Sequence, residues 1–182
     1  MIYTPREDSF LLTKHLSRCV KNRSFLDMGS GSGIQSDTAL KFKAKSITAS
    51  DINEESIKLL KNKFKSSQKI KIIKSNLFSK IKGKFDVIAF NPPYLPEDKR
   101  EDAASARATT GGKHGDEVIL QFLKQAPKHL NKTGTILLIV SSLTPQNKIN
   151  NLLKKLKLKK TIIDQCTFFM EILELWRLKA TP

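Results

Sequence analysis

The sequence predicts an α/β fold with a doubly wound, mostly parallel sheet that helices cover on both faces. Short runs rich in β-branched and aromatic residues alternate with amphipathic stretches, and several of these runs are apolar at almost every position. Strands of that kind are typical of a parallel sheet buried on both sides. Because no repeat and no Pro/Gly-rich linker divides the 182 residues, we expect one domain over residues 1–182.

Each element is predicted from its local pattern. Apolar residues recur at helical spacing from Phe10 to Leu16, after the polar Asp8 and Ser9, which predicts an opening helix. Asn53 followed by two glutamates is a typical helix start. Further helices are expected over 34–42, 117–126 and 145–156, and strands over 24–28, 46–50, 70–73, 85–90 and 135–140. A closing hairpin is expected from 161–169 and 171–178.

Composition narrows the class of protein. The longest apolar run, 136–140, is far shorter than the roughly 20 residues that cross a membrane, and acidic residues stand where a signal peptide would have its apolar core. Cys19 and Cys166 are isolated and lack metal-ligand spacing, so neither a disulfide nor a metal site is predicted. We therefore expect a cytoplasmic protein without membrane association.

The chain is strongly basic. Lys and Arg number 33 against 17 Asp and Glu, so 33 − 17 is a net charge of +16, and most of the cations are lysine. Proteins that recognise nucleic acid bases rely more on arginine, whose planar guanidinium binds bidentately. Lysine-rich solvated helix faces explain the charge about as well as an acidic or RNA partner does. The charge alone does not decide the function.

A glycine-rich loop follows the first predicted strand. Asp27 ends this strand, and Gly29, Gly31 and Gly33 follow at alternate positions. The spacing differs from the dinucleotide fingerprint, and no Gly-Lys-Ser/Thr ending makes it a P-loop. Glycines let a ligand approach the backbone, and an acid ahead of them suits a ligand with an ammonium group, such as an adenosyl amino acid. The alternative is an ordinary turn between strand and helix.

Two further strand ends carry candidate ligand contacts. Asp51 ends the second strand, where a carboxylate accepts hydrogen bonds from two ribose hydroxyls. The alternative, a helix cap, is already filled by Asn53. Asn76 follows the third strand, and with Leu77 it is assigned to the adenine end of the ligand. As an isolated residue, Asn76 could equally be a turn residue.

The fourth strand leads directly into Asn91, Pro92, Pro93 and Tyr94. The prolines stiffen the backbone and remove two N–H donors, which leaves carbonyl oxygens as acceptors. A planar NH₂ group could donate to the Asn91 side chain and to the Pro92 carbonyl while the Tyr94 ring stacks on its face. This arrangement predicts transfer of a methyl group from a sulfonium to a poorly nucleophilic nitrogen, with positioning as the main catalytic device.

Together these motifs resemble the class I S-adenosylmethionine-dependent amino-methyltransferases. Two more segments narrow the resemblance to the short, archaeal and eukaryotic type of HemK-related enzyme, which methylates a glutamine of class I peptide-chain release factors. They are the opening Tyr3-x-Pro5-x-Glu7-Asp8-Ser9-Phe10-Leu11-Leu12 and the later Gly111-Gly112-x-x-Gly115-x-Glu117-Val118. The resemblance implies a Rossmann-like, seven-stranded sheet of order 3-2-1-4-5-7-6 with an N-terminal helix.

The resemblance also implies the cofactor, the substrate and several contacts. S-adenosylmethionine is the expected methyl donor, and the Gly-Gly-Gln loop of the release factor is the expected acceptor. Ser9 is expected to contact the cofactor, and Asn91 to contact both cofactor and substrate. Asn76 stands where the family usually has aspartate, so a weaker adenine contact is expected. Longer bacterial members carry an extra N-terminal helical domain, which this chain is expected to lack.

Other functions remain open at this stage. The Asn-Pro-Pro-Tyr site would suit N6-adenine or N2-guanine methylation of RNA or DNA, which the positive charge favours and the lack of an arginine-rich or aromatic surface opposes. Direct nucleic-acid binding is therefore not expected, although the charge keeps it open. Lysine methylation of proteins is a third possibility, and a cofactor-binding scaffold without activity is a fourth.

The third strand is expected at an open edge of the sheet. Lysines bracket its isoleucines in the segment 69–74, which by itself discourages unwanted strand pairing. The resemblance suggests a different role, since short family members pair with a small zinc-binding activator along this edge. Ile72 and Ile73 are adjacent, so at least one must face away from a single buried side. We expect such a partner.

Overall fold

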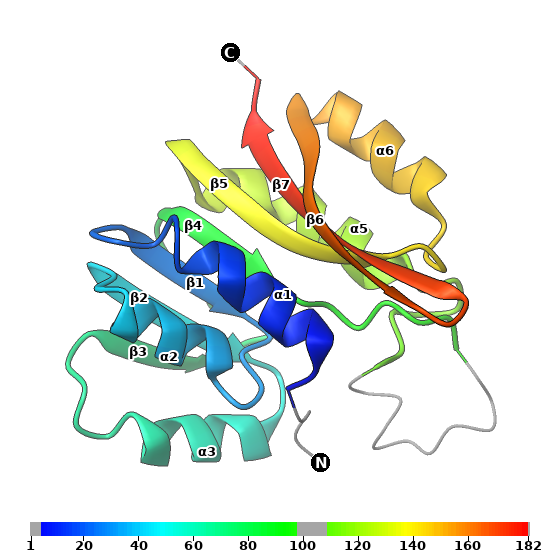
Figure 1. The fold of residues 1–182 in the computed structure, drawn as a ribbon. Coiled ribbons are helices and arrows are strands. Elements are labelled where there is room, and N and C mark those ends of the chain that lie inside the picture. Colours follow the sequence, from blue (N-terminus) through cyan, green and yellow to red (C-terminus); the bar gives the residue numbers. More distant parts are fainter. Residues whose placement is uncertain (1–4, 98–108, 182) are drawn as a thin grey trace.

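A computed structural model describes residues 5–97 and 109–181. They form a seven-stranded sheet of order β3-β2-β1-β4-β5-β7-β6, with helices packed on both faces (Figure 1). This is the fold class that the sequence predicted and the strand order that the family resemblance implied. Tyr3, which belongs to the opening motif, lies outside the described residues.

The elements follow one another along the chain much as predicted. The first part comprises α1 (Glu7–Leu16), β1 (Ser24–Met28), α2 (Ile34–Lys41), β2 (Ser46–Asp51), α3 (Glu54–Lys63), β3 (Ile70–Lys74) and β4 (Phe85–Phe90). The second part comprises α5 (Glu117–Gln125), the 3-10 helix η1 (Ala126–His129), β5 (Leu130–Ser141), α6 (Gln146–Lys155), β6 (Leu158–Phe168) and β7 (Glu171–Ala180).

Strand direction determines where a ligand can bind. β3, β2, β1, β4 and β5 are parallel, so their carboxyl ends meet at one edge of the sheet. β7 lies antiparallel between β5 and β6, as the predicted hairpin requires. The chain order reverses between β1 and β4, and such a switch point opens a crevice above the strand ends.

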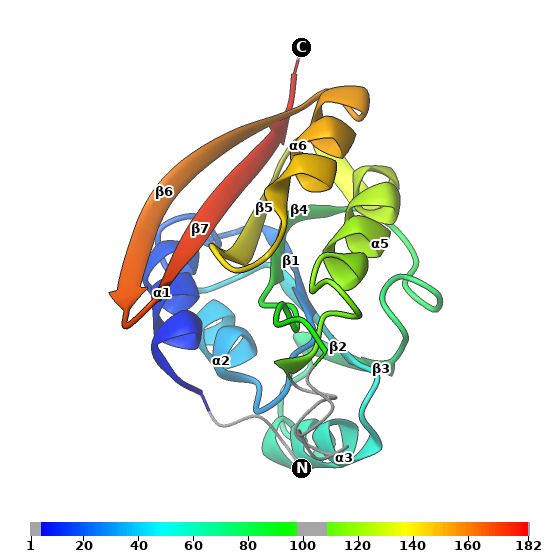
Figure 2. The same ribbon diagram turned by 90° about the vertical axis from the view of Figure 1, so that its right-hand side faces the viewer.

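The sheet separates two layers of helices. On one face, Leu12 and Leu16 of α1 pack with Ala39 of α2 against alternate strand residues, and α3 continues this layer through Leu60. On the other face, α5 and α6 cover a second apolar cluster that includes Trp176. Figure 2 shows α1 and α2 on one side of the sheet and α5 and α6 on the other. Strand residues therefore alternate between two apolar layers, which explains the near-continuous apolar runs.

β5 begins five residues before the predicted start at residue 135. Its register with β4 shifts between Phe85 and Val87, so that Leu130 pairs with Phe85 ahead of the regular ladder. Asn131 donates a hydrogen bond to the Asp86 carboxylate, 2.7 Å away. The extension depends on contacts with β4, and its polar residues have little intrinsic strand preference.

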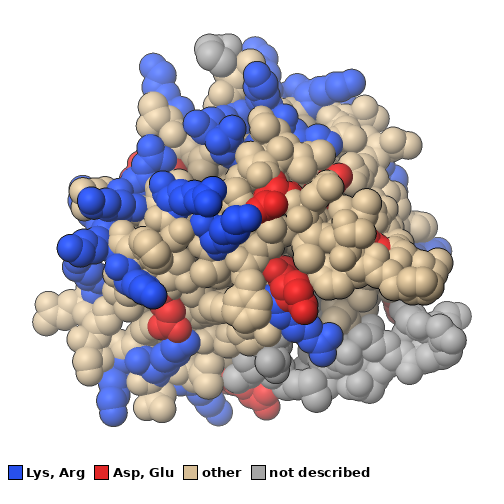
Figure 3. Space-filling model, in the orientation of Figure 1, with Lys and Arg blue, Asp and Glu red and all other residues tan. Residues whose placement is uncertain are grey.

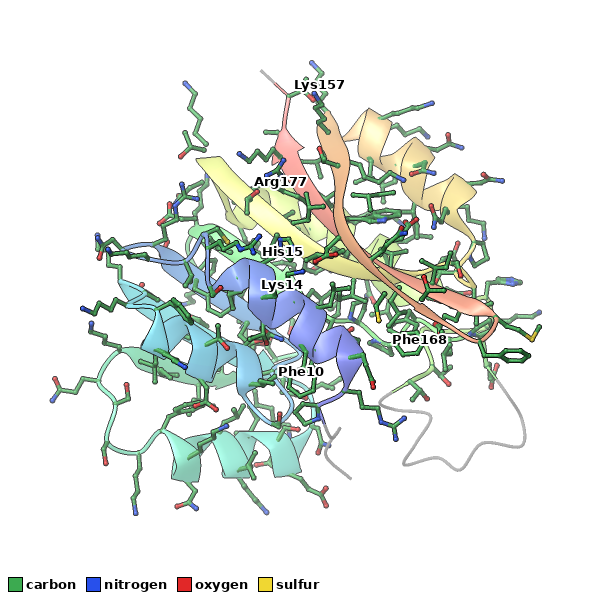
Figure 4. The ribbon with its side chains drawn as sticks, in the orientation of Figure 1. Phe10, Lys14, His15, Lys157, Phe168 and Arg177 are labelled. Carbon is green, nitrogen blue, oxygen red and sulfur yellow. The ribbon has the colours of Figure 1, made fainter. Side chains whose placement is uncertain are left out.

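Helix α1 is attached to the sheet at its carboxyl-terminal end. Lys14 Nζ and His15 Nε2 lie 2.8 and 2.7 Å from the same oxygen of Asp164 on β6. These contacts, Lys14 foremost, hold the pKa of the Asp164 carboxyl well below its usual range. Figure 4 shows Lys14 and His15 together on α1, and Phe168 far along β6 near the turn of the hairpin.

In the part of the chain that the structure describes, no helix is long and apolar enough to cross a membrane.

Candidate active site

A cavity of about 1020 Å³ lies at the carboxyl ends of the parallel strands. Its size is at the upper end of the usual range for small-molecule sites. The residues predicted from the sequence that line it are Ser9, Asp27, Gly29, Gly31, Asp51, Asn76, Leu77, Asn91, Pro92, Pro93 and Tyr94. Segments that are distant in sequence thus meet at one place because their strands end at the same edge.

Gly33 is the predicted site residue that does not line the cavity. Its φ is +79°, and a Cβ there would lie 2.6 Å from Leu60 Cδ2 and 3.0 Å from Phe64 Cε2. Both neighbours belong to the apolar cluster under α3. Gly33 therefore lets the glycine loop pack closely on the end of α3, while Gly29 and Gly31 stand at the cavity wall.

Asp27 places a carboxylate at the cavity wall, with 2% of the residue exposed. Ser36 Oγ on α2 donates a hydrogen bond of 2.6 Å to it. Burial raises the pKa of Asp27 to about 7, and the Ser36 hydrogen bonds oppose the rise. A buried acid at the wall of a cavity favours a cationic ligand group, which would take over part of the lost solvation.

Asp51 holds the glycine loop and the start of α3 together. Its two oxygens accept hydrogen bonds from the backbone N–H groups of Gly31 and Asn53, each 2.8 Å long. Asn53 itself caps α3 by accepting from the Glu55 N–H at 3.0 Å, as predicted. Burial raises the pKa of Asp51, although these N–H donors oppose the rise. Each carboxylate oxygen keeps a further lone pair for a ligand hydroxyl.

Asn76 and Leu77 form the turn after β3. Asn76 is exposed on the cavity side, and Leu77 adopts a left-handed backbone with φ +45°. The Ser75 hydroxyl supports this strained turn by donating to the Leu77 carbonyl at 2.8 Å, and the Ser75 N–H donates to the Asp51 carbonyl at 2.9 Å. Strained backbone held in this way is common at ligand sites.

The Asn91–Tyr94 segment continues β4 into the cavity without regular structure. Two glycines of the later motif support it, because a Cβ on Gly111 would lie 2.6 Å from the Pro93 carbonyl oxygen and one on Gly115 would lie 2.6 Å from the Tyr94 carbonyl oxygen. Burial raises the pKa of the Tyr94 hydroxyl, and the negative charge of Asp8 adds to the rise. The ring is therefore neutral at physiological pH.

Sequence reasoning missed two parts of the site. Asp8 belongs to the opening motif, yet only its neighbour Ser9 was assigned to the site; Asp8 lines the cavity and accepts a 2.8 Å hydrogen bond from Asn91 Nδ2. Gly111 and Gly115 likewise belong to a sequence motif for which no role was predicted. The signal was present in each case, since the acid and the two glycines stand in the motifs that carry the family resemblance, but their contacts join segments far apart in the chain.

On the face of the molecule shown in Figure 3, the described Lys and Arg side chains do not gather at the edge of the sheet where the cavity lies. In Figure 3, Lys and Arg gather over the upper and left parts of this face, whereas the carboxyl ends of the parallel strands point to the right in the same orientation. Among residues 5–97 and 109–181, no group of three or more His, Cys, Asp or Glu side chains is placed to hold a metal ion.

A nucleotide-sized cavity at the switch point of this sheet, with acids at the ends of β1 and β2, is the architecture of a class I methyltransferase. Over residues 7–169 the chain matches the family of the methyltransferase small domain, and it belongs to that family.

Several proteins with similar sequences are named for glutamine methylation. MJ0928 of Methanocaldococcus jannaschii, named as a protein N5-glutamine methyltransferase, is 40% identical over 97% of this chain and 92% of its own length. A release factor glutamine methyltransferase of Fusobacterium nucleatum is 40% identical over 55% of this chain, which spans 30% of that relative. Among solved structures, a chain of the E. cuniculi Mtq2–Trm112 complex, responsible for methylating the termination factor eRF1, has a TM-score of 0.78 at 21% identity and covers 99% of both chains. That likeness establishes the fold.

Proposed function

We propose that this protein transfers a methyl group from S-adenosylmethionine to the side-chain amide nitrogen of a glutamine, in the Gly-Gly-Gln loop of a class I peptide-chain release factor. One observation carries the proposal: Asn91 lines the cavity, and its buried Oδ1 has no hydrogen-bond partner among the residues that the structure describes. A buried acceptor left unpaired costs about 1–3 kcal/mol, so a donor supplied by the substrate is strongly favoured there. The names of the relatives support the same substrate class.

The residues around the cavity fit S-adenosylmethionine. The buried Asp27 carboxylate suits its α-ammonium group, and Asp51 suits the ribose hydroxyls. Ser9, Gly29 and Gly31 would border the amino-acid end, and the turn at Asn76 and Leu77 would border the adenine. When bound, the cofactor supplies an electrophilic methyl group on a sulfonium.

The chain's own part in the reaction is to hold and orient the glutamine nitrogen. The Asn91 side-chain oxygen and the Pro92 carbonyl would accept its two N–H groups, and the Tyr94 ring would lie on the face of the amide. Both acceptors raise the electron density on nitrogen, and a fixed orientation removes much of the entropic cost of alignment. No strong base is required, because the nitrogen becomes acidic as it gains the methyl group. A tetrahedral lysine ammonium would fit this planar arrangement poorly.

The proposal extends to the organisation of the protein. Residues 1–182 would act as one S-adenosylmethionine-dependent methyltransferase domain in the cytoplasm, where release factors work. A small zinc-binding activator would dock along the free edge of β3. The structural neighbour from E. cuniculi is likewise in a complex with a partner, Trm112. Ile72 packs against the apolar cluster under α3, and Ile73 packs against the cluster on the opposite face of the sheet. Both side chains are therefore already partly buried within this chain. The partner would then bind chiefly through the unpaired backbone of β3.

Labelled methyl transfer tests the function. The protein, alone and with the candidate activator, is incubated with labelled S-adenosylmethionine and recombinant release factor, beside a factor in which the Gly-Gly-Gln glutamine is changed to alanine. Transfer to the first factor only is the expected result. Label in total RNA and none in release factor would instead support the nucleic-acid alternative.

Lys71→Glu, an exposed change on β3, should weaken activator binding without unfolding the chain.

A further inference from the structure

The carboxylate of Asp8 contacts the side-chain amide of Asn91, the group proposed to bind the substrate glutamine, although the two residues are far apart in the chain. Asp8 lies in the first turn of α1 and is 3% exposed. Its Oδ2 accepts a 2.8 Å hydrogen bond from Asn91 Nδ2, and its Oδ1 accepts from the N–H and the hydroxyl of Ser9 at 2.6 and 3.2 Å. Both Asp8 and Asn91 line the cavity.

This contact selects one of the two orientations of the Asn91 amide. An asparagine amide has a donor end and an acceptor end of nearly equal size, and only hydrogen-bond partners distinguish them. A carboxylate is an acceptor, so it attracts Nδ2 and would repel Oδ1. With Nδ2 held by Asp8, the Asn91 oxygen is turned away from the carboxylate and has no hydrogen-bond partner within residues 5–97 and 109–181.

The end of α1 that carries Asp8 is itself fixed. The Ser9 carbonyl accepts a 2.8 Å hydrogen bond from Gln35 Nε2 on α2, and Thr13 Oγ1 lies 3.2 Å from Gln35 Oε1. Gln35 is 5% exposed. The Asp8 carboxylate therefore stands at a position set by the packing of α1 on α2.

We propose, on the basis of the proposed function, that Asp8 is a positioning residue that holds the Asn91 amide with its oxygen directed to the substrate nitrogen. Without it, the amide could rotate and present its NH₂ group to the substrate NH₂, where two donors would meet. Asp8 would thus contribute to turnover through Asn91.

Asp8→Asn tests this with almost no change in shape. The Ser9 N–H keeps the oxygen of the new amide on its side, so a new NH₂ group faces Asn91 and drives that amide to turn. We expect kcat to fall about 100-fold with KM for the release factor changed little, the size of effect seen when one preorganised hydrogen bond is lost. Asp8→Ala, which lets Asn91 rotate without forcing it, should lose less. A structural role alone predicts the opposite order.

The double variant Asp8→Asn/Asn91→Asp provides a rescue. The new carboxylate at position 91 would accept from the new amide at position 8 and keep its other oxygen for the substrate, so kcat should recover at least tenfold over Asp8→Asn. Asp164→Asn is the matched control, because it weakens the attachment of α1 through Lys14 and His15 and Asp164 does not line the cavity. It should retain wild-type kcat if α1 stays in place.

Side-chain amide signals in nuclear magnetic resonance give a readout that needs no substrate. One Asn91 amide proton should be shifted downfield and exchange slowly in the wild type, and this bonded proton should disappear in Asp8→Asn. Wild-type-like kcat in Asp8→Asn, a loss no greater than in Asp8→Ala, or an unchanged Asn91 signal would overturn the proposal. If the wild type methylates no glutamine, the proposed function fails, and the amide signals still decide the role of Asp8.

Discussion

Gly115→Ala should damage the active site through a single methyl group. Gly115 has a φ of +83°, and its added Cβ would lie 2.6 Å from the Tyr94 carbonyl oxygen and 3.0 Å from the Pro96 nitrogen. Gly83→Ala is a matched control, because Gly83 has a φ of +86° and nothing lies within 4 Å of its added Cβ. The two changes share the same backbone strain and differ only in what the methyl group meets.

The structure sets the size of the difference. Both variants incur the cost of a left-handed alanine, about 1–2 kcal/mol. In Gly115→Ala the Tyr94 carbonyl must also move by at least 0.4 Å, the difference between 2.6 Å and the 3.0 Å that Cβ contacts require. The Thr144 hydroxyl holds that carbonyl with a 3.0 Å hydrogen bond, so the movement is resisted. Overpacking of this kind adds about 1–3 kcal/mol.

Two measurements test the reasoning. Urea unfolding should show Gly115→Ala to be about 2–5 kcal/mol less stable than the wild type, and Gly83→Ala only about 1–2 kcal/mol less stable. Methyl transfer to release factor should fall about 10- to 100-fold in kcat for Gly115→Ala, because a small misplacement of reacting groups is costly, and should stay near the wild-type value for Gly83→Ala. Equal activities in the two folded variants would refute the view that Gly115 positions the segment after Asn91.

Four further predictions concern the cofactor, the stability and the chemistry. Burial raises the pKa of Asp27 to about 7, so its ionised fraction falls from about three quarters at pH 7.5 to about one tenth at pH 6.0. S-adenosylmethionine should therefore bind about eightfold more weakly at the lower pH, and an unchanged Kd by calorimetry would contradict this. Because the folded state holds that proton more tightly than the unfolded chain, the stability of the wild type relative to Asp27→Asn should fall as the pH rises from about 4 to about 7. Asp51→Ala should weaken cofactor binding on the order of 10- to 100-fold, since charge-assisted hydrogen bonds are worth about 1.5–3 kcal/mol each, and unchanged affinity would remove Asp51 from the site. Asn91→Ala should abolish most methyl transfer while thermal melting stays cooperative, with Tyr94→Phe mild and Tyr94→Ala severe; near-normal turnover of Asn91→Ala would disprove the planar amide arrangement.

The sequence alone was sufficient for the fold class and for placing every predicted site residue except Gly33 at one cavity, and the family resemblance supplied the strand order. The fold class and the places of the site residues are local in origin, whereas the strand order is not. Strand and helix periodicities show which segments form strands and helices, and Asp27, Asp51 and Asn91 stand at strand ends, where parallel strands bring their neighbours together. Asn53 as the cap of α3 is local in the same sense.

Tertiary structure decided the contacts between segments that are far apart in the chain. Gly33 follows the same pattern as Gly29 and Gly31, yet it packs on Leu60, because only the position of α3 determines what lies beside its Cα. The bond from Asn91 to Asp8 depends on how α1 docks over the end of β4. Spacing along the chain shows which side chains can reach the edge of the sheet. The orientation of an amide and the closeness of a glycine to a carbonyl are set by packing between elements. Local sequence periodicity contains no information about that packing.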